Sequence, residues 1–247
     1  MNLCVFIEIG KNKMPITDCR GERTREQLVQ EFEIIPLAHV KLLEGQTKES
    51  CAGPTLDREY YVFSYQSHKN QYDSGTFVCG VTAANDFIDL IKQQNPAINR
   101  LPLFDPLSGF TQAGTPNSTN RVRGRGGPAH QMPNWNPIAK ELYDAIGMIC
   151  IMWNLNNIGG ALANILFNLT KNPTQTPNKS DIRSINTIIF KNFKTGNPPT
   201  PNLALRFQQF ISTNNNIKNP PLIQFPNLTA HFNQNVANEW SPNPYFN

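Results

Sequence analysis

The segment around Cys79 carries the residue types of a cysteine nucleophile. Cys79 ends a short apolar stretch, and Gly80 precedes a segment with helical periodicity. A thiolate at the start of a helix is stabilised by the helix dipole. If a turn at residues 73–75 closes a hairpin, the imidazole of His68 would face the thiol as a general base, with Asp73 or Asn70 orienting it. Cys79 and His68 are therefore a candidate catalytic pair.

Two other interpretations of the same residues compete with catalysis. A free cysteine is most often a small buried hydrophobe, and the sequence around Cys79 matches none of the neighbourhoods of known cysteine proteases. A zinc site would need three or four soft ligands, namely Cys51, His68, Cys79 and either Cys19 or His39. Structural zinc ligands usually come in close pairs, whereas these are widely separated single residues. We therefore expect no metal and no cofactor.

Three arginines in the segment NRVRGRGG suggest a different chemistry. Arg121, Arg123 and Arg125 alternate with other residues, and the adjacent glycines allow the backbone to approach a ligand closely. Guanidinium groups bind phosphate oxygens in pairs and stack on unpaired bases. The segment is therefore expected to contact a polyanion. Five cations of the following region would extend the same surface: Lys171, Lys179, Arg183, Lys191 and Lys194.

The charges are distributed unevenly along the chain. Residues 1–95 hold 10 basic and 13 acidic side chains, so their net charge is −3. Residues 96–247 hold 12 basic and 5 acidic side chains, so their net charge is +7, within an overall +4. Such an asymmetry favours a polyanionic partner for the second half.

The first half of the chain has the periodicity of alternating strands and helices. Residues 3–9 are apolar and β-branched, which predicts a strand, and a capping-box pattern at Thr24 and Gln27 predicts a helix through Ile35. Residues 60–65 and 76–79 alternate as strands do, and residues 82–93 place their apolar side chains on one helical face. Residues 95–137 are rich in Pro, Gly and Asn, which predicts a long connection without regular structure.

The second half is predicted to be mainly helical. Asn136 is a suitable N-cap and Pro137 a suitable first helical residue, ahead of an apolar stripe that ends at Trp153. Further stripes cover residues 158–169, residues 182–193 behind Ser180, and residues 203–211 behind Thr200 and Pro201. The tail from residue 214 is rich in Asn and Pro and predicts an extended segment anchored by aromatic side chains: Phe225, Phe232, Trp240, Tyr245 and Phe246.

Length, composition and motif content limit the classes of protein to which this chain can belong. The 247 residues, 39% hydrophobic, are enough for one compact α+β domain or two. We divide them into an α+β region (1–95), a connection with the basic segment (96–136), a helical region (137–213) and the tail (214–247). The P-loop, GxGxxG, HExxH and GxSxG motifs are missing from the sequence, which argues against P-loop ATPases and Rossmann dehydrogenases.

The cysteines and the apolar segments bear on where the protein resides. The five cysteines are widely spaced with no CxxC pair, which predicts reduced thiols and a cytoplasmic location. The first residues lack the pattern of an export signal. The longest apolar stretch, residues 145–153, is too short to span a membrane.

The function these patterns favour is binding of RNA or single-stranded DNA by an intracellular protein, with contacts led by the phosphate backbone. One alternative is a cysteine-dependent enzyme that uses Cys79 with His68. The other is a protein–protein interaction subunit whose apolar helices and aromatic tail pack on a partner. The residues do not decide between an enzyme and a binding protein.

Overall fold

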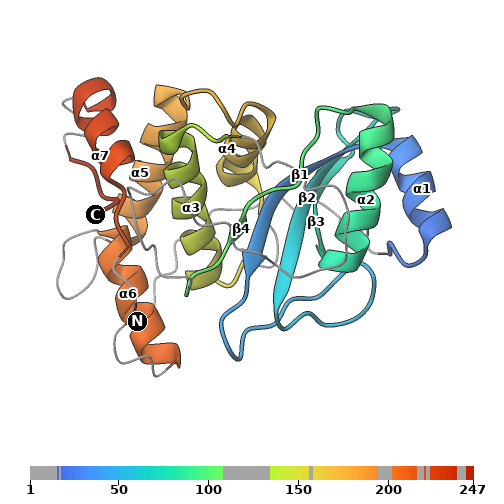
Figure 1. Ribbon diagram of the computed structural model, residues 1–247, viewed down its shortest axis with the longest axis horizontal. Helices are drawn as coiled ribbons and strands as arrows, with labels where there is room; N and C mark the ends of the chain where they lie inside the picture. Colours follow the sequence, from blue (N-terminus) through green and yellow to red (C-terminus); the bar gives the residue numbers. More distant parts are fainter. Residues whose placement is uncertain are drawn as a thin grey trace.

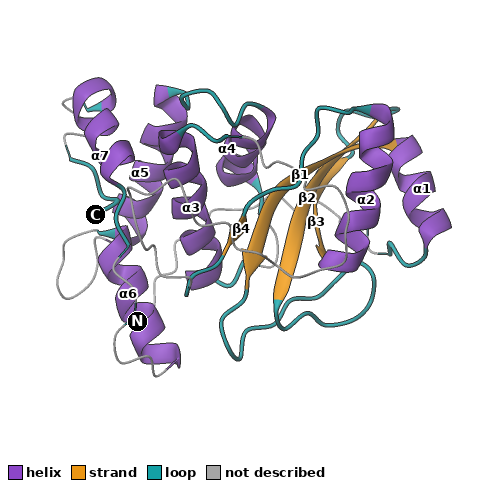
Figure 2. Cartoon of the chain, viewed as in Figure 1, coloured by secondary structure: helices purple, strands orange, loops and turns teal. Residues whose placement is uncertain are grey.

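The chain forms a mixed sheet followed by a set of helices (Figures 1 and 2). The computed structural model describes residues 16, 18–107, 134–155, 158–193, 202–215, 220, 223–237 and 243–247. The first half contains α1 (Glu22–Glu31), β1 (Phe32–Lys41), β2 (Glu59–Ser67), β3 (Ser74–Gly80), α2 (Val81–Gln94) and β4 (Leu103–Phe104). The second half contains α3 (Pro137–Met152), α4 (Gly160–Lys171), α5 (Lys179–Phe193), α6 (Leu203–Asn215), α7 (Pro226–His231) and a π-helical turn (Phe232–Val236). The predicted α+β class is confirmed.

The four strands lie in the order β3-β2-β1-β4. β1 pairs antiparallel with β2, and β2 pairs antiparallel with β3, as the predicted hairpin requires. β4 adds a short parallel edge, where His39 and Val40 pair with Leu103 and Phe104. The long middle strands therefore carry most of the sheet, and helices lie on both sides of it (Figure 1).

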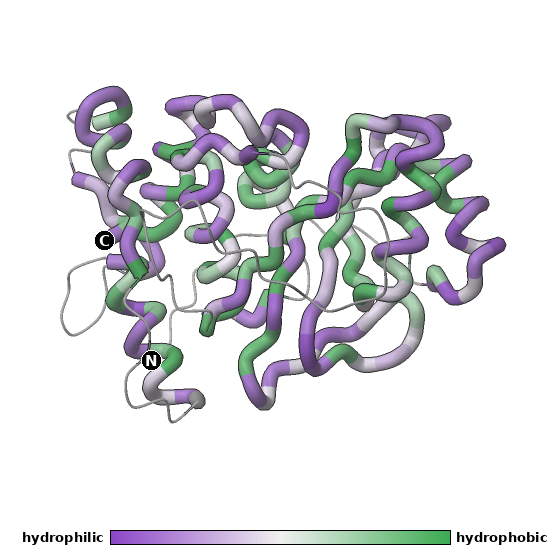
Figure 3. The backbone as a smooth tube through the Cα atoms, in the orientation of Figure 1, coloured by the Kyte–Doolittle hydropathy of each residue, from purple (hydrophilic) through white to green (hydrophobic). Residues whose placement is uncertain are grey.

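The sheet lies between two hydrophobic cores, because successive side chains of a strand point to opposite faces. Tyr61, Phe63 and Phe77 face the core that holds α1 and α2. Tyr60 and Val62 face the larger core, which holds α3 to α6. Because both faces are covered, residues 60–63 of β2 form a continuous run of buried apolar side chains. Helix α1 is mostly hydrophilic (Figure 3), and Val29 is its one buried residue, so this helix forms a largely exposed outer layer.

The helix predicted through Ile35 ends earlier than expected. α1 stops at Glu31, and Phe32–Lys41 is strand β1, which the sequence analysis missed. Pro36 lies inside this strand at a register irregularity between Pro36 and Ala38. β4 reaches only His39 and Val40, so the missing N–H of Pro36 falls where β1 has no partner on that side. The opening strand predicted over residues 3–9 lies outside the described residues.

Helix α3 begins as its sequence predicts. The Oδ1 atom of Asn136 accepts hydrogen bonds from the backbone N–H groups of Ile138 (2.9 Å) and Ala139 (3.3 Å), and Pro137 is the first helical residue. Farther along, Gly147 lets Phe104 of β4 pack directly on the helix. A Cβ atom at residue 147 would lie 2.6 Å from that ring. The close approach joins the edge of the sheet to the helical half.

The last third of the chain differs from its prediction in two details. Ser180 was expected to cap a helix but lies within α5, and the side chain of Asn202 caps α6 by accepting from the N–H of Leu205 at 2.8 Å. The tail predicted as extended forms α7 and the π-helical turn over residues 226–236. Three of its predicted anchors are buried: Phe225, Phe232 and Phe246. No helix among the described residues is long and apolar enough to cross a membrane.

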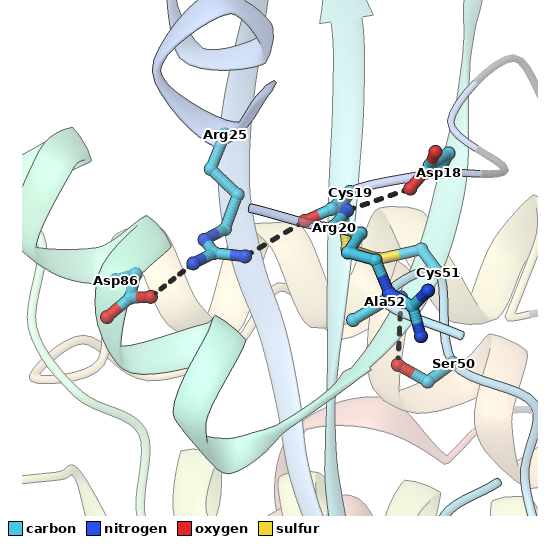
Figure 4. Close-up of a disulfide and its surroundings, with 8 residues drawn as sticks. All are labelled: Asp18, Cys19, Arg20, Arg25, Ser50, Cys51, Ala52 and Asp86. Carbon is cyan, nitrogen blue, oxygen red and sulfur yellow. Dashed lines mark hydrogen bonds and ion pairs between the residues drawn. A yellow bond between two sulfur atoms is a disulfide. The ribbon is translucent and has the colours of Figure 1, made fainter. Parts of the chain in front are cut away.

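Two cysteines predicted to be reduced form a disulfide. Cys19 and Cys51, 32 residues apart in the sequence, are joined with a Cα–Cα distance of 5.2 Å (Figure 4). Arg25 of α1 lies beside the bridge, because Nη1 donates to the carbonyl of Cys19 at 2.9 Å while Nη2 bonds Asp86 of α2 at 2.6 Å. The prediction of reduced thiols is therefore wrong for this pair, although Cys79 and Cys150 are free and buried. The cytoplasmic location stays a prediction.

Candidate nucleic-acid interface

Helix α5 presents an aromatic side chain in line with two cations. Four of its described side chains are fully buried: Ile182, Ile185, Asn186 and Ile189. Lys179, Arg183 and Phe190 are separated by four and seven residues, about one and two helical turns, so they lie along a single face. Lys179 is exposed, and Phe190 keeps 40% of its surface exposed. This face borders the segment formed by the last residues of the chain.

Asn186 attaches that C-terminal segment to α5. Its side chain is buried, with Nδ2 donating to the carbonyl of Asn243 at 2.9 Å and Oδ1 accepting from the N–H of Tyr245 at 2.7 Å. The carbonyl of Tyr245 accepts from the N–H of Leu203, in the first turn of α6, at 2.9 Å. The backbone of Tyr245 is therefore held from both sides by two different helices.

The consequence of this attachment is an aromatic stack on the outside of α5. The ring of Tyr245 lies 5.2 Å from that of Phe190, centroid to centroid, with only 21° between the two planes. Tyr245 also packs against the large core, whereas Phe190 faces outward. The stack thus extends from the core to Phe190, whose ring is partly exposed.

The charges around the stack are positive. Lys191, in the last turn of α5, is exposed and adjacent to Phe190. Arg183 is half-buried and donates from Nη2 to the carbonyl of Val236 at 3.1 Å. The acidic residue of α5, Asp181, precedes Phe190 by two and a half turns and so lies on the opposite side. We call Lys179, Arg183, Phe190, Lys191 and Tyr245 the α5 platform.

The predicted nucleic-acid residues are only partly within the described structure. Lys191 belongs to the α5 platform, and Lys179 and Arg183 join it there. Arg121, Arg123, Arg125 and Lys194 lie outside the described residues, so their part in a common surface stays a prediction. Lys171 ends α4 and is exposed, with its Nζ 5.4 Å from the ring centroid of Phe167.

The structure does not bring Cys79 and His68 together. Cys79 pairs with Tyr61, near the start of β2, whereas His68 follows the end of that strand. Tyr61 and His68 are seven residues apart along the chain, about 23 Å in an extended strand. The Cys79 side chain is fully buried, and this burial raises the pKa of its thiol far above the ordinary value. His68 is exposed at the hairpin turn, so the predicted catalytic pair is wrong.

The zinc alternative fails for a related reason. Cys51 is bonded to Cys19, so neither sulfur is a thiolate that could hold a metal. His68 lies at the far end of the hairpin from Cys79. Within the parts of the chain that the structure describes, no group of three or more His, Cys, Asp or Glu side chains is arranged to hold a metal ion.

Among the three histidines that the structure describes, His39 has the most extensive polar surroundings. Its Nε2 lies 3.1 Å from Oε2 of Glu59, its ring stacks on Tyr61 at 4.0 Å, and its backbone N–H donates to the hydroxyl of Tyr143 at 2.8 Å. Burial lowers the pKa of His39, and the carboxylate of Glu59 opposes that shift. A ring that stacks on the sheet and pairs with a carboxylate holds β1 against β2, which is a structural role.

Lys48 is an unusual buried lysine and yields a pH-dependent prediction. Only 3% of the residue is exposed, and Nζ donates to Oδ1 of Asn154 (2.7 Å) and the carbonyl of Leu155 (2.8 Å), just beyond the end of α3. Burial lowers the pKa of Lys48 from 10.5 to about 8. Between these two values the unfolded chain binds more protons than the folded one. The free energy of unfolding should therefore rise with pH in this window.

The measurement compares wild type with Lys48→Met by urea unfolding from pH 7.5 to pH 10.5. Methionine has a similar length and does not titrate, so groups common to both proteins cancel in the difference. The wild type should gain stability relative to the variant as the pH rises from about 8 towards 10.5. Parallel stability curves for the two proteins would contradict the prediction.

Phe190 and Asn186 were not predicted as site residues, because the sequence around them indicates their roles only weakly. Phe190 follows Ile189 directly, and a helical projection would have placed it off the apolar stripe, in line with Lys179 and Arg183. Asn186 interrupts the stripe with a polar side chain, and a buried amide needs partners, but its partners are more than fifty residues away. Tyr245 was expected to anchor the tail, and it does so on α5.

Comparison with known proteins identifies a family. A family model described as "Uncharacterised conserved protein UCP028583" matches residues 17–197. No curated protein and no solved structure matches the chain. The matched range contains the sheet and helices α1 to α5, whereas Tyr245 lies beyond it.

Proposed function

The chain belongs to that family, whose description assigns no activity, and we propose that the protein binds RNA or single-stranded DNA with contacts led by the phosphate backbone. The observation that carries the proposal is the charge of the second half, where 12 basic side chains accompany 5 acidic ones. A surface with this excess attracts polyanions over distances of about 10 Å at moderate salt.

The acidic side chains of the second half have partners within the protein. Lys41 of β1 neutralises Asp105, with 2.7 Å between Nζ and Oδ2, and Lys140 bonds both oxygens of the buried Asp144. Glu141 accepts hydrogen bonds from the backbone of Leu228 and from Asn227. Asp181 accepts from Asn168 at 3.2 Å. Four of the five acids thus have internal partners, and the fifth, Glu239, lies outside the described residues.

Several cations of the same half face solvent. Lys171, Lys179 and Lys191 are exposed on α4 and α5. Flexible exposed lysines bind phosphate oxygens as point charges and read no base sequence, which supports binding led by the backbone. The basic segment with Arg121, Arg123 and Arg125 would add bidentate contacts to the same ligand.

The two alternative functions have less support. The catalytic hypothesis needed an accessible Cys79 near His68, and the fold separates them. The interaction-subunit hypothesis needed unburied tail aromatics, but Phe225, Phe232 and Phe246 are buried within this chain. Trp240, another of the tail aromatics, lies outside the described residues, so the interaction-subunit hypothesis stays a prediction.

The experiment is a titration of the purified full chain with labelled single-stranded RNA, single-stranded DNA and duplex DNA. Binding should weaken linearly on a plot of log affinity against log salt. Replacing Arg121, Arg123 and Arg125 together by alanine should lower the slope for single strands by about two, since each phosphate contact contributes about 0.7. The slope should fall because the variant would neutralise three fewer phosphates and would therefore release fewer counterions.

A matched control replaces three exposed cations of the other half, Arg23, Arg58 and Lys69, by alanine. This variant changes the net charge equally and should leave the salt slope unchanged. Absence of binding by the wild type at low salt would overturn the proposed function. An equal loss of slope in both variants would show a net-charge effect and refute a contact made by the basic segment.

A further inference from the structure

We propose that the bridge between Cys19 and Cys51 is a redox switch: when oxidised it holds helix α1 against the rest of the fold, and its reduction releases that helix. This inference goes beyond the proposed function and does not depend on it. It also gives a role to Cys79, the free cysteine of β3, because release of α1 uncovers its thiol.

Helix α1 has few stabilising features of its own. Val29 is its one buried residue, and its N-cap residue, Gly21, supplies no side-chain cap. The helix has ten residues, and an isolated helix of that length is only marginally stable in water. The order of α1 therefore depends on the contacts that join it to the neighbouring elements.

Several of these contacts meet at the disulfide (Figure 4). The N–H of Cys19 donates to the carbonyl of Cys51 at 2.8 Å, and the N–H of Cys51 donates to the carbonyl of Val78 on β3 at 2.9 Å. Arg25 of α1 donates to the carbonyl of Cys19 at 2.9 Å and pairs with Asp86 of α2 at 2.6 Å. The S–S bond is therefore the covalent part of a connection that runs from β3 to α1.

Cys79 lies beside this connection. It follows Val78 on β3, and its side chain belongs to the same core as both bridged cysteines. Burial raises the pKa of its thiol, and the nearby charges of Arg25 and Asp86 act on that pKa in opposite directions. Cys150, also free and buried, belongs to the larger core on the other face of the sheet. Release of α1 should therefore uncover Cys79 and leave Cys150 protected.

The switch opens by thiol–disulfide exchange with a thiol reductant. Cys51 keeps 9% of its surface exposed, whereas Cys19 is fully buried, so the reductant's thiolate attacks Sγ of Cys51. A mixed disulfide forms, and the electron pair of the broken S–S bond goes to Sγ of Cys19, which takes up a proton. A second thiolate then displaces Cys51, and the two reductant molecules leave joined as a disulfide. In a cytoplasm, the predicted location, disulfides are usually transient and redox-sensing.

The experiment measures how fast iodoacetamide alkylates Cys79 and Cys150 in the folded full chain, with mass spectrometry as the readout. The oxidised wild type should protect both thiols. In the Cys19→Ser, Cys51→Ser double variant Cys79 should react at least about 10-fold faster, because the constraint of a bridge that spans 32 residues is worth more than this factor. Cys150 should stay protected. Hydrogen exchange of residues 22–31 should rise in the same variant, while that of β2 should not.

Ile146→Ala is the matched control, because it removes a fully buried side chain from the larger core and leaves the bridge intact. This variant should be less stable than wild type, yet Cys79 should stay protected in it. If Cys79 remains as protected in the double variant as in the oxidised wild type, the bridge is a static cross-link and the switch is overturned. If Cys79 and Cys150 become equally reactive, the double variant opens as a whole, and a local release of α1 is refuted.

Discussion

Replacing Phe63 with alanine is expected to lower the free energy of unfolding by about 3 to 5 kcal/mol. Phe63 lies in β2, the strand that is paired on both sides, and its side chain is fully buried. Its ring lies 5.3 Å from Phe77, 5.5 Å from Phe87 and 6.0 Å from Tyr61. Removing the ring leaves a cavity between the sheet and α2, because close-packed neighbours fixed by the backbone relax only in part.

The measurement is the midpoint and slope of a guanidinium unfolding curve for each protein. Tyr72→Ala serves as the control, since it also removes an aromatic ring but from a hairpin turn where 85% of the residue is exposed. Its effect should stay within about 0.5 kcal/mol. Phe63→Leu keeps much of the volume and should lose less than Phe63→Ala. Equal losses in the Phe63→Ala and Tyr72→Ala proteins would show that Phe63 does not fill the core.

Removing the disulfide is the second large effect, with an expected loss of about 4 kcal/mol in the Cys19→Ala, Cys51→Ala double variant. The bridge spans 32 residues of sequence, so the open chain gains much conformational freedom when unfolded. The bridge also ties the segment before α1 to the loop beside β3, where the N–H of Cys51 donates to the carbonyl of Val78 at 2.9 Å. Arg25, bonded to Cys19 and Asp86, links the bridge to both helices of this face.

Urea unfolding with and without a thiol reductant tests the disulfide. The reductant should shift the wild-type midpoint to lower urea and should leave the double variant unchanged. Cys150→Ala is the control for a cysteine outside the bridge, and its own stability should still respond to the reductant. A wild-type midpoint that ignores the reductant, together with two reactive thiols at Cys19 and Cys51 in the unfolded protein, would contradict the bridge.

Local signals in the sequence predicted most of the regular elements. Asn136 and Pro137 specify the start of α3 because the cap and its two N–H partners lie within one turn. The alternation of residues 60–65 predicted β2, and the apolar face of residues 82–93 predicted α2, because each pattern is read within a single element. Strand β1 was not predicted because Leu28, Phe32 and Ile35 also have the spacing of a helix. The residues that β1 pairs with in β2 are about thirty positions away, so no local pattern indicates the pairing.

The contacts of the candidate site, in contrast, join residues that are far apart in the sequence. Cation content pointed to the second half, and Lys191 was among the predicted contacts, but the aromatic stack depends on Asn186, Asn243 and Tyr245 meeting across more than fifty residues. Cys79 and His68 are close in sequence, yet the antiparallel hairpin separates them by most of its length. Closeness along the chain was therefore a poor guide to closeness in space.

Sequence patterns were sufficient to predict the α+β class and the order of most helices and strands, and they include the excess of positive charge in the second half. These depend on side-chain periodicity, caps and composition, which act over a few residues. Three features depend on the three-dimensional fold: the Cys19–Cys51 bond, the burial of Cys79 and the stacking of Tyr245 on Phe190. Such contacts form only when the protein folds as a whole. Joining distant segments costs conformational entropy, and this cost is offset by the burial of apolar side chains throughout the core.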